Sequence, residues 1–163
     1  MTGWGLGLPM VAQMWTAELK WSKSLILDAA ESTKYIDPKS GKSPMEDLSS
    51  KVGQFFEFFS SQNLEQMANF LKKDTRLYFP KTQPLIGKER ILKFFKILFR
   101  QYPELTFTIE HTIAEQEKVA AHWKNRGINR KKEPYENEGV TLFFFENGLV
   151  SLMSDFFKDT GKF

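Results

Sequence analysis

The sequence predicts an α+β fold in which helices cover one face of a curved antiparallel sheet. Three observations predict this class. Residues 44–102 show helical spacing of apolar side chains with capping signals, and residues 105–157 hold four segments rich in β-branched and aromatic residues. The links between those segments are short, which favours antiparallel neighbours. The expected order is α-α-β-α-β-β-β-β, which is typical of an α+β architecture.

Capping signals place the helices. Ser43-Pro44-Met45-Glu46 has an N-cap serine, a proline at the first helical position and a glutamate three residues after the cap, so a helix is expected from here through KVGQFFEFFSS. Asn63 and Gln66 repeat the cap-plus-three pattern and open a second helix, LEQMANFLKK. A short strand, TRLYFP, and a turn-rich connection, TQPLIG, precede a third helix, KERILKFFKILFRQY, which stops before Pro103.

The remaining chain is predicted to be sheet. The four expected strands are LTFTIEHTIAE, KVAAHWKNRGI, NEGVTLFFF and LVSLMSDFF, each bounded by turn residues. Asn147-Gly148 joins the last two as a hairpin.

The chain divides near residue 40, because residues 36–44, IDPKSGKSP, have the composition of a linker. Residues 1–43 are therefore expected to be an N-terminal helical extension and linker, and residues 44–163 the main domain. Within the extension, residues 11–35 have the apolar stripe of a helix, and Trp4, Trp15 and Trp21 indicate that it docks on another surface.

Composition narrows the function classes. The chain has no Cys and two His among 163 residues, which excludes thiolate chemistry and disfavours a multi-histidine metal site. A net charge of +3 does not by itself indicate a nucleic-acid partner. No apolar run reaches the ~20 residues that span a bilayer, and no basic segment precedes the first apolar stretch, so a cytoplasmic protein is expected. No phosphate loop or nucleophile elbow is present, and no cofactor is expected.

Two longer motifs resemble a known family. They are YFP…PLIGKERI and EKVAAHWKNRGINRKKEPYENEGVTLFFFENGLVSLMSDFF, and together they resemble the SnoaL-like branch of the nuclear transport factor 2-like superfamily over about residues 45–160. The resemblance implies a cone-shaped sheet around an apolar pocket and a homodimer formed through the outer sheet face. The superfamily includes isomerases, polyketide cyclases, epoxide hydrolases and dehydratases, together with members that only bind ligands or partners, so the fold does not choose among them.

The resemblance can be tested residue by residue against these enzymes. The three positions that serve ketosteroid isomerases hold Phe79, Phe55 and Thr141, so that chemistry is missing. The Arg and Asp positions of limonene-type epoxide hydrolases hold Trp123 and Asn125, which weakens that reading. Asp155 matches the aspartate on which SnoaL-type polyketide cyclases rely as a general acid/base.

The hairpin register decides which face Asp155 occupies. A two-residue turn at Asn147-Gly148 pairs Glu146 with Leu149 and turns Asp155 away from the face of Thr141. A three-residue loop places Thr141 and Phe143 on one face with Met153, Asp155 and Phe157, which matches the family's pocket face. The second register is the one expected here.

The same resemblance turns Ala120, His122, Lys124 and Arg126 towards the cavity. A pair between His122 and Asp155 then becomes feasible across the intervening strand. The alternative is a histidine bonded to a backbone carbonyl, without a catalytic role.

The sequence thus leads to a pocket for a small, largely apolar molecule, with isomerase, cyclase or hydratase-type chemistry as one outcome. Asp155 and His122 are the catalytic candidates. The predicted ligand-binding residues are Phe55, Phe59, Phe79, Lys124, Arg126, Thr141, Phe143, Met153 and Phe157. The alternative function is a non-catalytic ligand-binding or dimerisation module. No metal, nucleic acid or membrane partner is expected.

Overall fold

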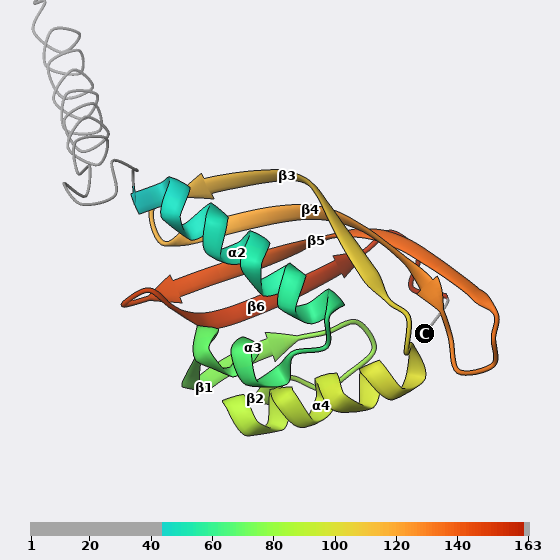
Figure 1. The fold of residues 1–163 in the computed structure, drawn as a ribbon. Coiled ribbons are helices and arrows are strands. Elements are labelled where there is room, and N and C mark those ends of the chain that lie inside the picture. The colour runs from blue at the N-terminus through green and yellow to red at the C-terminus, as the bar shows by residue number, and fades with distance from the viewer. Residues whose placement is uncertain (1–43, 162–163) are drawn as a thin grey trace, which may run out of the picture. The chain divides into compact units, whose positions relative to one another are not determined.

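The computed structural model describes residues 44–161, in which three helices pack against a six-stranded sheet (Figure 1). The helices are α2 (Pro44–Ser60), α3 (Leu64–Phe70) and α4 (Lys88–Gln101). The strands are β1 (Leu71–Tyr78), β2 (Leu85–Ile86), β3 (Thr106–Glu115), β4 (Lys118–Ile128), β5 (Pro134–Glu146) and β6 (Leu149–Phe157). The predicted α+β class is confirmed. The helix expected within residues 11–35 lies outside the described residues.

The sheet has the strand order β2-β1-β6-β5-β4-β3. Neighbouring strands are antiparallel except β1 and β6, which pair in parallel, so the sheet is mixed rather than wholly antiparallel as expected. In the parallel pair, Leu71 follows α3 directly, is buried and pairs with Val150. This places the first and last strands of the domain side by side.

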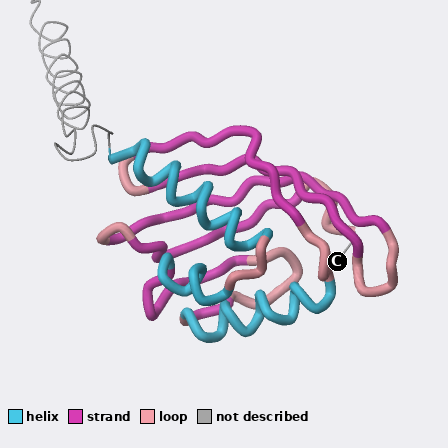
Figure 2. The backbone as a smooth tube through the Cα atoms, viewed as in Figure 1, coloured by secondary structure: helices cyan, strands magenta, loops and turns pink. Residues whose placement is uncertain are grey.

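The helices lie on one face of the sheet, with α2 over β3 and β4 and α4 against β1 (Figure 2). The spacing of apolar residues explains which side of α2 and which side of α4 is buried. In α2 the buried positions are Leu48, Val52, Phe55, Phe56 and Phe59, and in α4 they are Ile91, Phe95 and Phe99. Each set repeats at three or four residues, so each helix presents one apolar stripe to the sheet.

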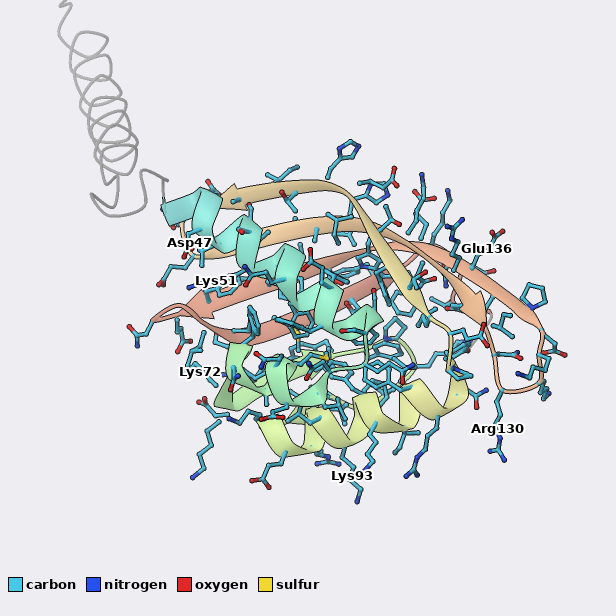
Figure 3. The ribbon with its side chains drawn as sticks, viewed as in Figure 1. Asp47, Lys51, Lys72, Lys93, Arg130 and Glu136 are labelled. Atoms are coloured by element: carbon cyan, nitrogen blue, oxygen red, sulfur yellow. The ribbon has the colours of Figure 1, made fainter. Side chains whose placement is uncertain are left out.

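Side chains fill the space between the two layers (Figure 3). Many of the buried ones are phenylalanines. The Phe143 ring on β5 meets Phe55 and Phe56 of α2 edge-on, at centroid distances of 5.6 and 5.9 Å. The ring centroid of Phe59 lies 5.1 Å from that of Phe95 and 5.0 Å from that of Phe99. These contacts pack α2 against α4. Edge-to-face contacts add to the stabilisation from burial alone.

Three elements differ from the sequence prediction by more than one residue: α3, β1 and β5, which begins at Pro134 instead of Asn137. The second helix ends at Phe70, not Lys73, and the first strand covers 71–78 instead of 75–80. Long-range pairing overrides the helical pattern here, since Leu71 is buried against the sheet and the Thr75 hydroxyl donates to the Val150 carbonyl at 2.7 Å. The two-residue strand β2 pairs with β1 and was not predicted. None of the described helices is long and apolar enough to cross a membrane.

Candidate functional site

A narrow cavity lies between the helices and the inner face of the sheet. Its free volume is about 40 Å³, enough for a few water molecules and well below the ~150 Å³ of a cavity that binds benzene. Aromatic and aliphatic side chains form most of its wall. The lining residues are Phe55, Phe56, Phe59, Leu77, Phe79, Phe95, Leu98, Tyr102, Leu105, Phe107, Trp123, Asn125, Tyr135, Thr141, Phe143, Met153, Asp155 and Phe157.

The β5–β6 hairpin places Asp155 on this inner face by a route different from the predicted one. Glu146 pairs with Leu149, and Asn147 and Gly148 both have positive φ angles, of 53° and 74°, as a two-residue type I′ turn requires. The predicted three-residue loop is therefore wrong. Ser151 is then an extra residue in β6, because Phe145 pairs with Val150 and Phe144 with Leu152.

Without the bulge at Ser151, the two-residue turn would place Asp155 on the outer face of the sheet. The bulge turns the residues that follow it, Asp155 included, to the opposite face. Beyond it, Phe143 pairs with Met153 and Thr141 with Asp155. The Ser151 hydroxyl donates to the Phe144 carbonyl at 3.1 Å and stabilises the irregular backbone. Asp155 consequently shares the cavity wall with Thr141, Phe143, Met153 and Phe157, as the chosen register expected.

Asp155 lies in surroundings that favour its neutral form. It keeps part of its surface accessible on the cavity wall, but the adjoining side chains are mostly apolar. Burial raises the pKa of the carboxyl to about 7, and the hydrogen bond from Thr141 opposes that rise. A carboxyl group with such a pKa exchanges its proton near neutral pH.

A chain of two hydrogen bonds orients this carboxyl. The indole Nε1 of Trp123 donates to the Thr141 hydroxyl at 2.9 Å, and the hydroxyl donates to Oδ1 of Asp155 at 2.5 Å. An indole N–H can only donate, so the hydroxyl proton of Thr141 is directed at Asp155. Thr141 and Trp123 are almost fully buried, which holds the chain in one geometry.

The opposite part of the cavity wall carries a second polar group of side chains. Tyr102 and Tyr135 pack together with their ring centroids 4.5 Å apart, and Asn125 lies on the same wall. Burial raises the pKa of Tyr135 to about 12 and also raises that of Tyr102, so both hydroxyls stay protonated at neutral pH. Sequence reasoning did not identify these three residues as cavity residues.

The facing predicted for β4 is wrong. Buried and accessible residues alternate along this strand, with Val119, Ala121, Trp123 and Asn125 pointing inward. The register explains this, because Ala121 pairs with Thr141 and directly opposed residues share a face. His122, Lys124 and Arg126 therefore lie on the outer face, where they avoid the cost of desolvating charge in an apolar cavity.

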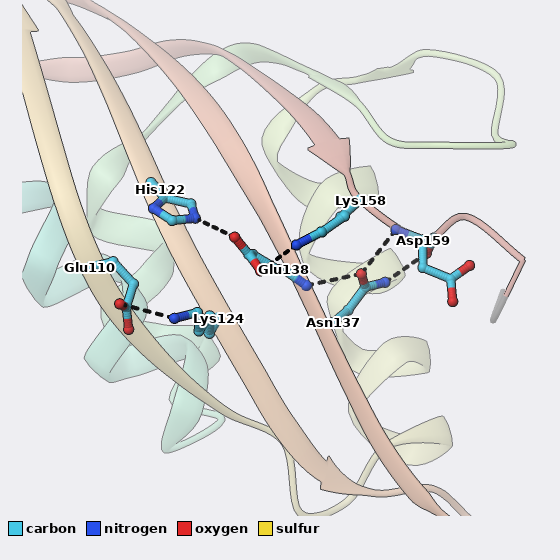
Figure 4. A network of polar contacts seen from close by, with 7 residues as sticks. All are labelled: Glu110, His122, Lys124, Asn137, Glu138, Lys158 and Asp159. Carbon is cyan, nitrogen blue, oxygen red and sulfur yellow. Dashed lines mark hydrogen bonds and ion pairs between the residues drawn. The ribbon is translucent and has the colours of Figure 1, made fainter.

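His122 accordingly has a different partner from the one predicted. Its Nε2 lies 2.9 Å from Oε1 of Glu138, and Lys158 reaches the other oxygen of the same carboxylate at 3.0 Å (Figure 4). Lys158 first, and then His122, hold the pKa of Glu138 below its usual value. Nearby, Lys124 pairs with Glu110 at 3.1 Å. These are contacts on the outer face and contribute nothing to the cavity.

The residues predicted to bind a ligand therefore fall into two groups, those that line the cavity and those that do not. Phe55, Phe59, Phe79, Thr141, Phe143, Met153 and Phe157 line the cavity, whereas Lys124 and Arg126 do not. The residues that prediction missed include Trp123 and Asn125. Their signal was present in the sequence, because Val119, Ala121 and Trp123 form the apolar half of a simple alternation with His122, Lys124 and Arg126. Within residues 44–161, no cluster of three or more His, Asp or Glu side chains could hold a metal ion.

A curved sheet that holds three helices and one apolar cavity defines the nuclear transport factor 2-like fold. The chain belongs to the SnoaL-like domain family, whose model matches residues 52–153. The resemblance drawn from the sequence motifs is thereby confirmed. A search of curated protein sequences finds no match.

Solved structures of similar fold are numerous. A proposed SnoaL-like polyketide cyclase from Jannaschia sp. CCS1 is 20% identical, with a TM-score of 0.65 over 72% of this chain and 90% of that chain. A nuclear transport factor 2-like protein of unknown function from Burkholderia pseudomallei K96243 is 19% identical, with a TM-score of 0.66 over 71% and 93%. A protein with a ketosteroid isomerase-like fold from Catenulispora acidiphila DSM 44928, solved in complex with trimethylamine, is 13% identical, with a TM-score of 0.60 over 64% and 82%. At these identities the likeness concerns the fold.

Proposed function

We propose that this protein binds a small, largely apolar molecule in the cavity and catalyses a proton transfer on it, with Asp155 as general acid/base. One observation carries the proposal: among the described residues that line the cavity, Asp155 is the one carboxyl, the side chains around it are mostly apolar, and burial raises its pKa to about 7. At neutral pH such a group is present in both protonation states, so it can remove a proton and return it. Isomerisation, cyclisation and hydration are reaction classes of this type.

The hydrogen-bond chain supports the same role. Thr141 occupies Oδ1 of Asp155, and no other side chain in residues 44–161 is within hydrogen-bond distance of the carboxyl. The second oxygen is therefore left for a ligand. Because Trp123 directs the Thr141 hydroxyl, the carboxyl is held in one orientation before a ligand arrives.

The small free volume limits the ligand. A cavity of about 40 Å³ admits a substrate only if phenylalanine side chains such as Phe79 or Phe157 rotate away. Both are half-buried, and their ring centroids lie 5.1 Å apart at the cavity wall.

A second function is favoured by a different observation. Among the described residues that line the cavity, there is no second carboxylate, no histidine and no cation that could act with Asp155 in catalysis. The free volume of the cavity is also small. A non-catalytic module, in which the aromatic side chains serve mainly as a core, accounts for both features. Activity therefore has to be measured.

Proton exchange on a simple ketone tests catalysis without knowledge of the natural substrate. Cyclopentanone is incubated in D₂O with the wild-type protein, and loss of its α-proton signal is followed by NMR. Asp155 would take the α proton and return a deuteron. We expect exchange faster than in buffer, with a rate that rises with pH through an apparent pKa of about 7.

Asp155→Asn is the decisive variant, since it keeps the shape of the side chain and cannot titrate. It should reduce exchange to the rate in buffer. Lys124→Met, which alters an outer-face side chain, is the matched control and should exchange as fast as wild type. Equal rates for wild type and Asp155→Asn would contradict the catalytic role and favour the non-catalytic module.

A further inference from the structure

Two buried asparagines lie opposite each other on neighbouring strands, and their hydrogen bonding differs. Asn125 on β4 pairs in the register with Asn137 on β5, and the two residues are 5% and 8% exposed. The Asn137 amide donates to the Asp159 carbonyl at 2.7 Å and to the Tyr135 hydroxyl at 3.3 Å. Its oxygen accepts from the backbone N–H groups of Glu138 and Asp159. Asn137 is therefore fully bonded within the protein.

Asn125 is the exception. Its Oδ1 is buried and has no hydrogen-bond partner within residues 44–161. An unpaired buried acceptor is costly, and native proteins retain few of them without a functional reason. The fully bonded neighbour shows that partners are at hand on this part of the sheet. The unpaired oxygen is therefore specific to Asn125, which lines the cavity.

The position of Asn125 separates it from Asp155. Asp155 pairs with Thr141, which pairs with Ala121, and Asn125 lies four residues further along β4. Four residues of strand correspond to about 13 Å. Asp155 and Asn125 thus lie at separate positions along the cavity wall, and Trp123 lies between the levels of the two along β4.

We propose that the Asn125 side chain binds a hydroxyl group of a neutral ligand at the end of the cavity away from Asp155. The hydroxyl O–H would donate to Oδ1 and supply the missing partner. This inference rests on the proposed function only in that a ligand enters the cavity; it does not require catalysis by Asp155. It assigns the ligand to a class, namely apolar molecules that carry a hydroxyl remote from the reacting atom.

The charges on the wall support a neutral ligand. Among the lining side chains that the structure describes, none is a lysine or arginine. A carboxylate or phosphate on the ligand would lose its hydration without gaining a cation. Tyr102 and Tyr135, which lie at the same end as Asn125, keep their hydroxyls protonated and add no charge. A hydroxyl meets the unpaired oxygen at no electrostatic cost.

Phenol and toluene are the probes, because they differ by a hydroxyl in place of a methyl group of similar size. Their affinities are measured by NMR titration for wild type, Asn125→Leu and Asp155→Asn. The expected result is that the ratio of phenol to toluene affinity falls about tenfold in Asn125→Leu and by less than that in Asp155→Asn. An unchanged ratio in Asn125→Leu, or a fall confined to Asp155→Asn, would overturn the proposal.

Melting temperatures test the role of Asn125 without a ligand. Asn125→Leu should melt at or above the wild-type temperature, since it removes an unpaired polar group, whereas the matched variant Asn137→Leu should melt at least about 5 °C lower. A loss in Asn125→Leu as large as that in Asn137→Leu would mean a structural role and overturn the proposal. Should leucine prevent folding by its shape, Asn125→Ala decides by the same affinity ratio.

Failure of both probes to bind also overturns this proposal. The proposed function is decided separately, by the exchange rate of cyclopentanone and its loss in Asp155→Asn. The two proposals can therefore fail independently.

Discussion

Thr141 and Asp155 lie directly opposite each other on β5 and β6, and the Thr141 hydroxyl donates to the Asp155 carboxyl at 2.5 Å. The pair depends on the bulge at Ser151, which brings residues 152–157 into the register that faces the cavity. The pH dependence of stability and the proton exchange proposed for Asp155 follow from that relationship.

The first prediction concerns stability and pH. Folding raises the pKa of Asp155 from 3.8 to about 7, so between these values the folded protein holds a proton that the unfolded chain has lost. This contribution to stability is fully present below about pH 4 and is lost as the pH rises through about 7, by at most about 4 kcal/mol. Urea unfolding at pH 5 and pH 8 measures it.

Asp155→Asn removes this titration. The variant should show a smaller loss of stability between pH 5 and pH 8 than wild type, and should be the more stable of the two at pH 8. Identical pH dependence in the two proteins would show that the carboxyl is hydrated as in water.

The second prediction concerns the middle of the hydrogen-bond chain. Thr141→Val removes the acceptor of the Trp123 indole N–H and the donor to Asp155. Leaving the buried N–H unpaired should lower the free energy of unfolding by about 1–3 kcal/mol. Because the bond from Thr141 lowers the pKa of Asp155, its removal should raise that pKa further. Carbon-detected NMR titration of Asp155 measures the shift.

Thr141→Ser keeps the hydroxyl and is the matched control. It should retain the wild-type pKa of Asp155. If the valine and serine variants titrate alike, the hydroxyl is not the group that lowers the pKa.

The third prediction concerns Gly139, which pairs with Trp123 across β4 and β5. A Cβ atom at this position would lie 2.6 Å from Cζ2 of Trp123 and 2.4 Å from the Phe156 carbonyl oxygen. Gly139→Ala should therefore cost about 1–3 kcal/mol of stability through overpacking. It should also change the Trp fluorescence, because the indole must move.

Gly53 in α2 provides the contrasting case, since nothing lies within 4 Å of the Cβ position there. Gly53→Ala should raise stability by about 0.5–1 kcal/mol, the usual effect in a helix interior. Both variants are compared by denaturant unfolding. Equal stability in Gly139→Ala and wild type would contradict the tight packing of Trp123.

The fourth prediction concerns assembly. We propose that the protein forms a homodimer through the outer sheet face, where alternation along the strands gathers an apolar patch. The patch consists of Ile113, Val140, Leu142, Phe144, Leu152 and Phe156. Ile113 is 73% exposed and Phe156 57% exposed, which is unusual for large apolar side chains on a single chain.

Phe156→Glu should convert the dimer to a monomer in sedimentation velocity at micromolar concentration. The matched control is Ile97→Glu, because Ile97 on α4 is also 57% exposed but lies on the helical side of the domain. That variant should remain dimeric. A monomeric wild-type protein, or equal effects of the two variants, would exclude a dimer through this face.

The local elements could be predicted from the sequence because their signals are local. The phenylalanines of α2 and α4 recur at three or four residues, and apolar and polar residues alternate over residues 119–126 of β4. Such periodicity depends only on helix and strand geometry. The same holds for the family resemblance, whose motifs, between residues 78 and 157, overlap the residues 52–153 that the family model matches.

The candidate site could be predicted only in part. Asp155 and its apolar neighbours were identified, but His122, Lys124 and Arg126 were assigned to the wrong face. The error arose from transferring the family's cavity positions to β4 instead of following its apolar alternation. Asn125 was placed at an epoxide hydrolase position but was not predicted to bind a ligand, because its importance lies in a missing hydrogen bond, which no sequence pattern shows.

The sequence by itself determined the helices, the four long strands and the presence of an acidic residue between Met153 and Phe157, since these depend on residues close along the chain. Only the tertiary structure decided that this acid faces the cavity. A strand has two faces that differ by one residue of register, and here a single extra residue, Ser151, selects between them. The parallel pairing of β1 with β6 was likewise decided by contacts between residues about 75 positions apart, such as Thr75 and Val150. Such contacts depend on the whole packed domain, because no local pattern encodes the partner of a strand.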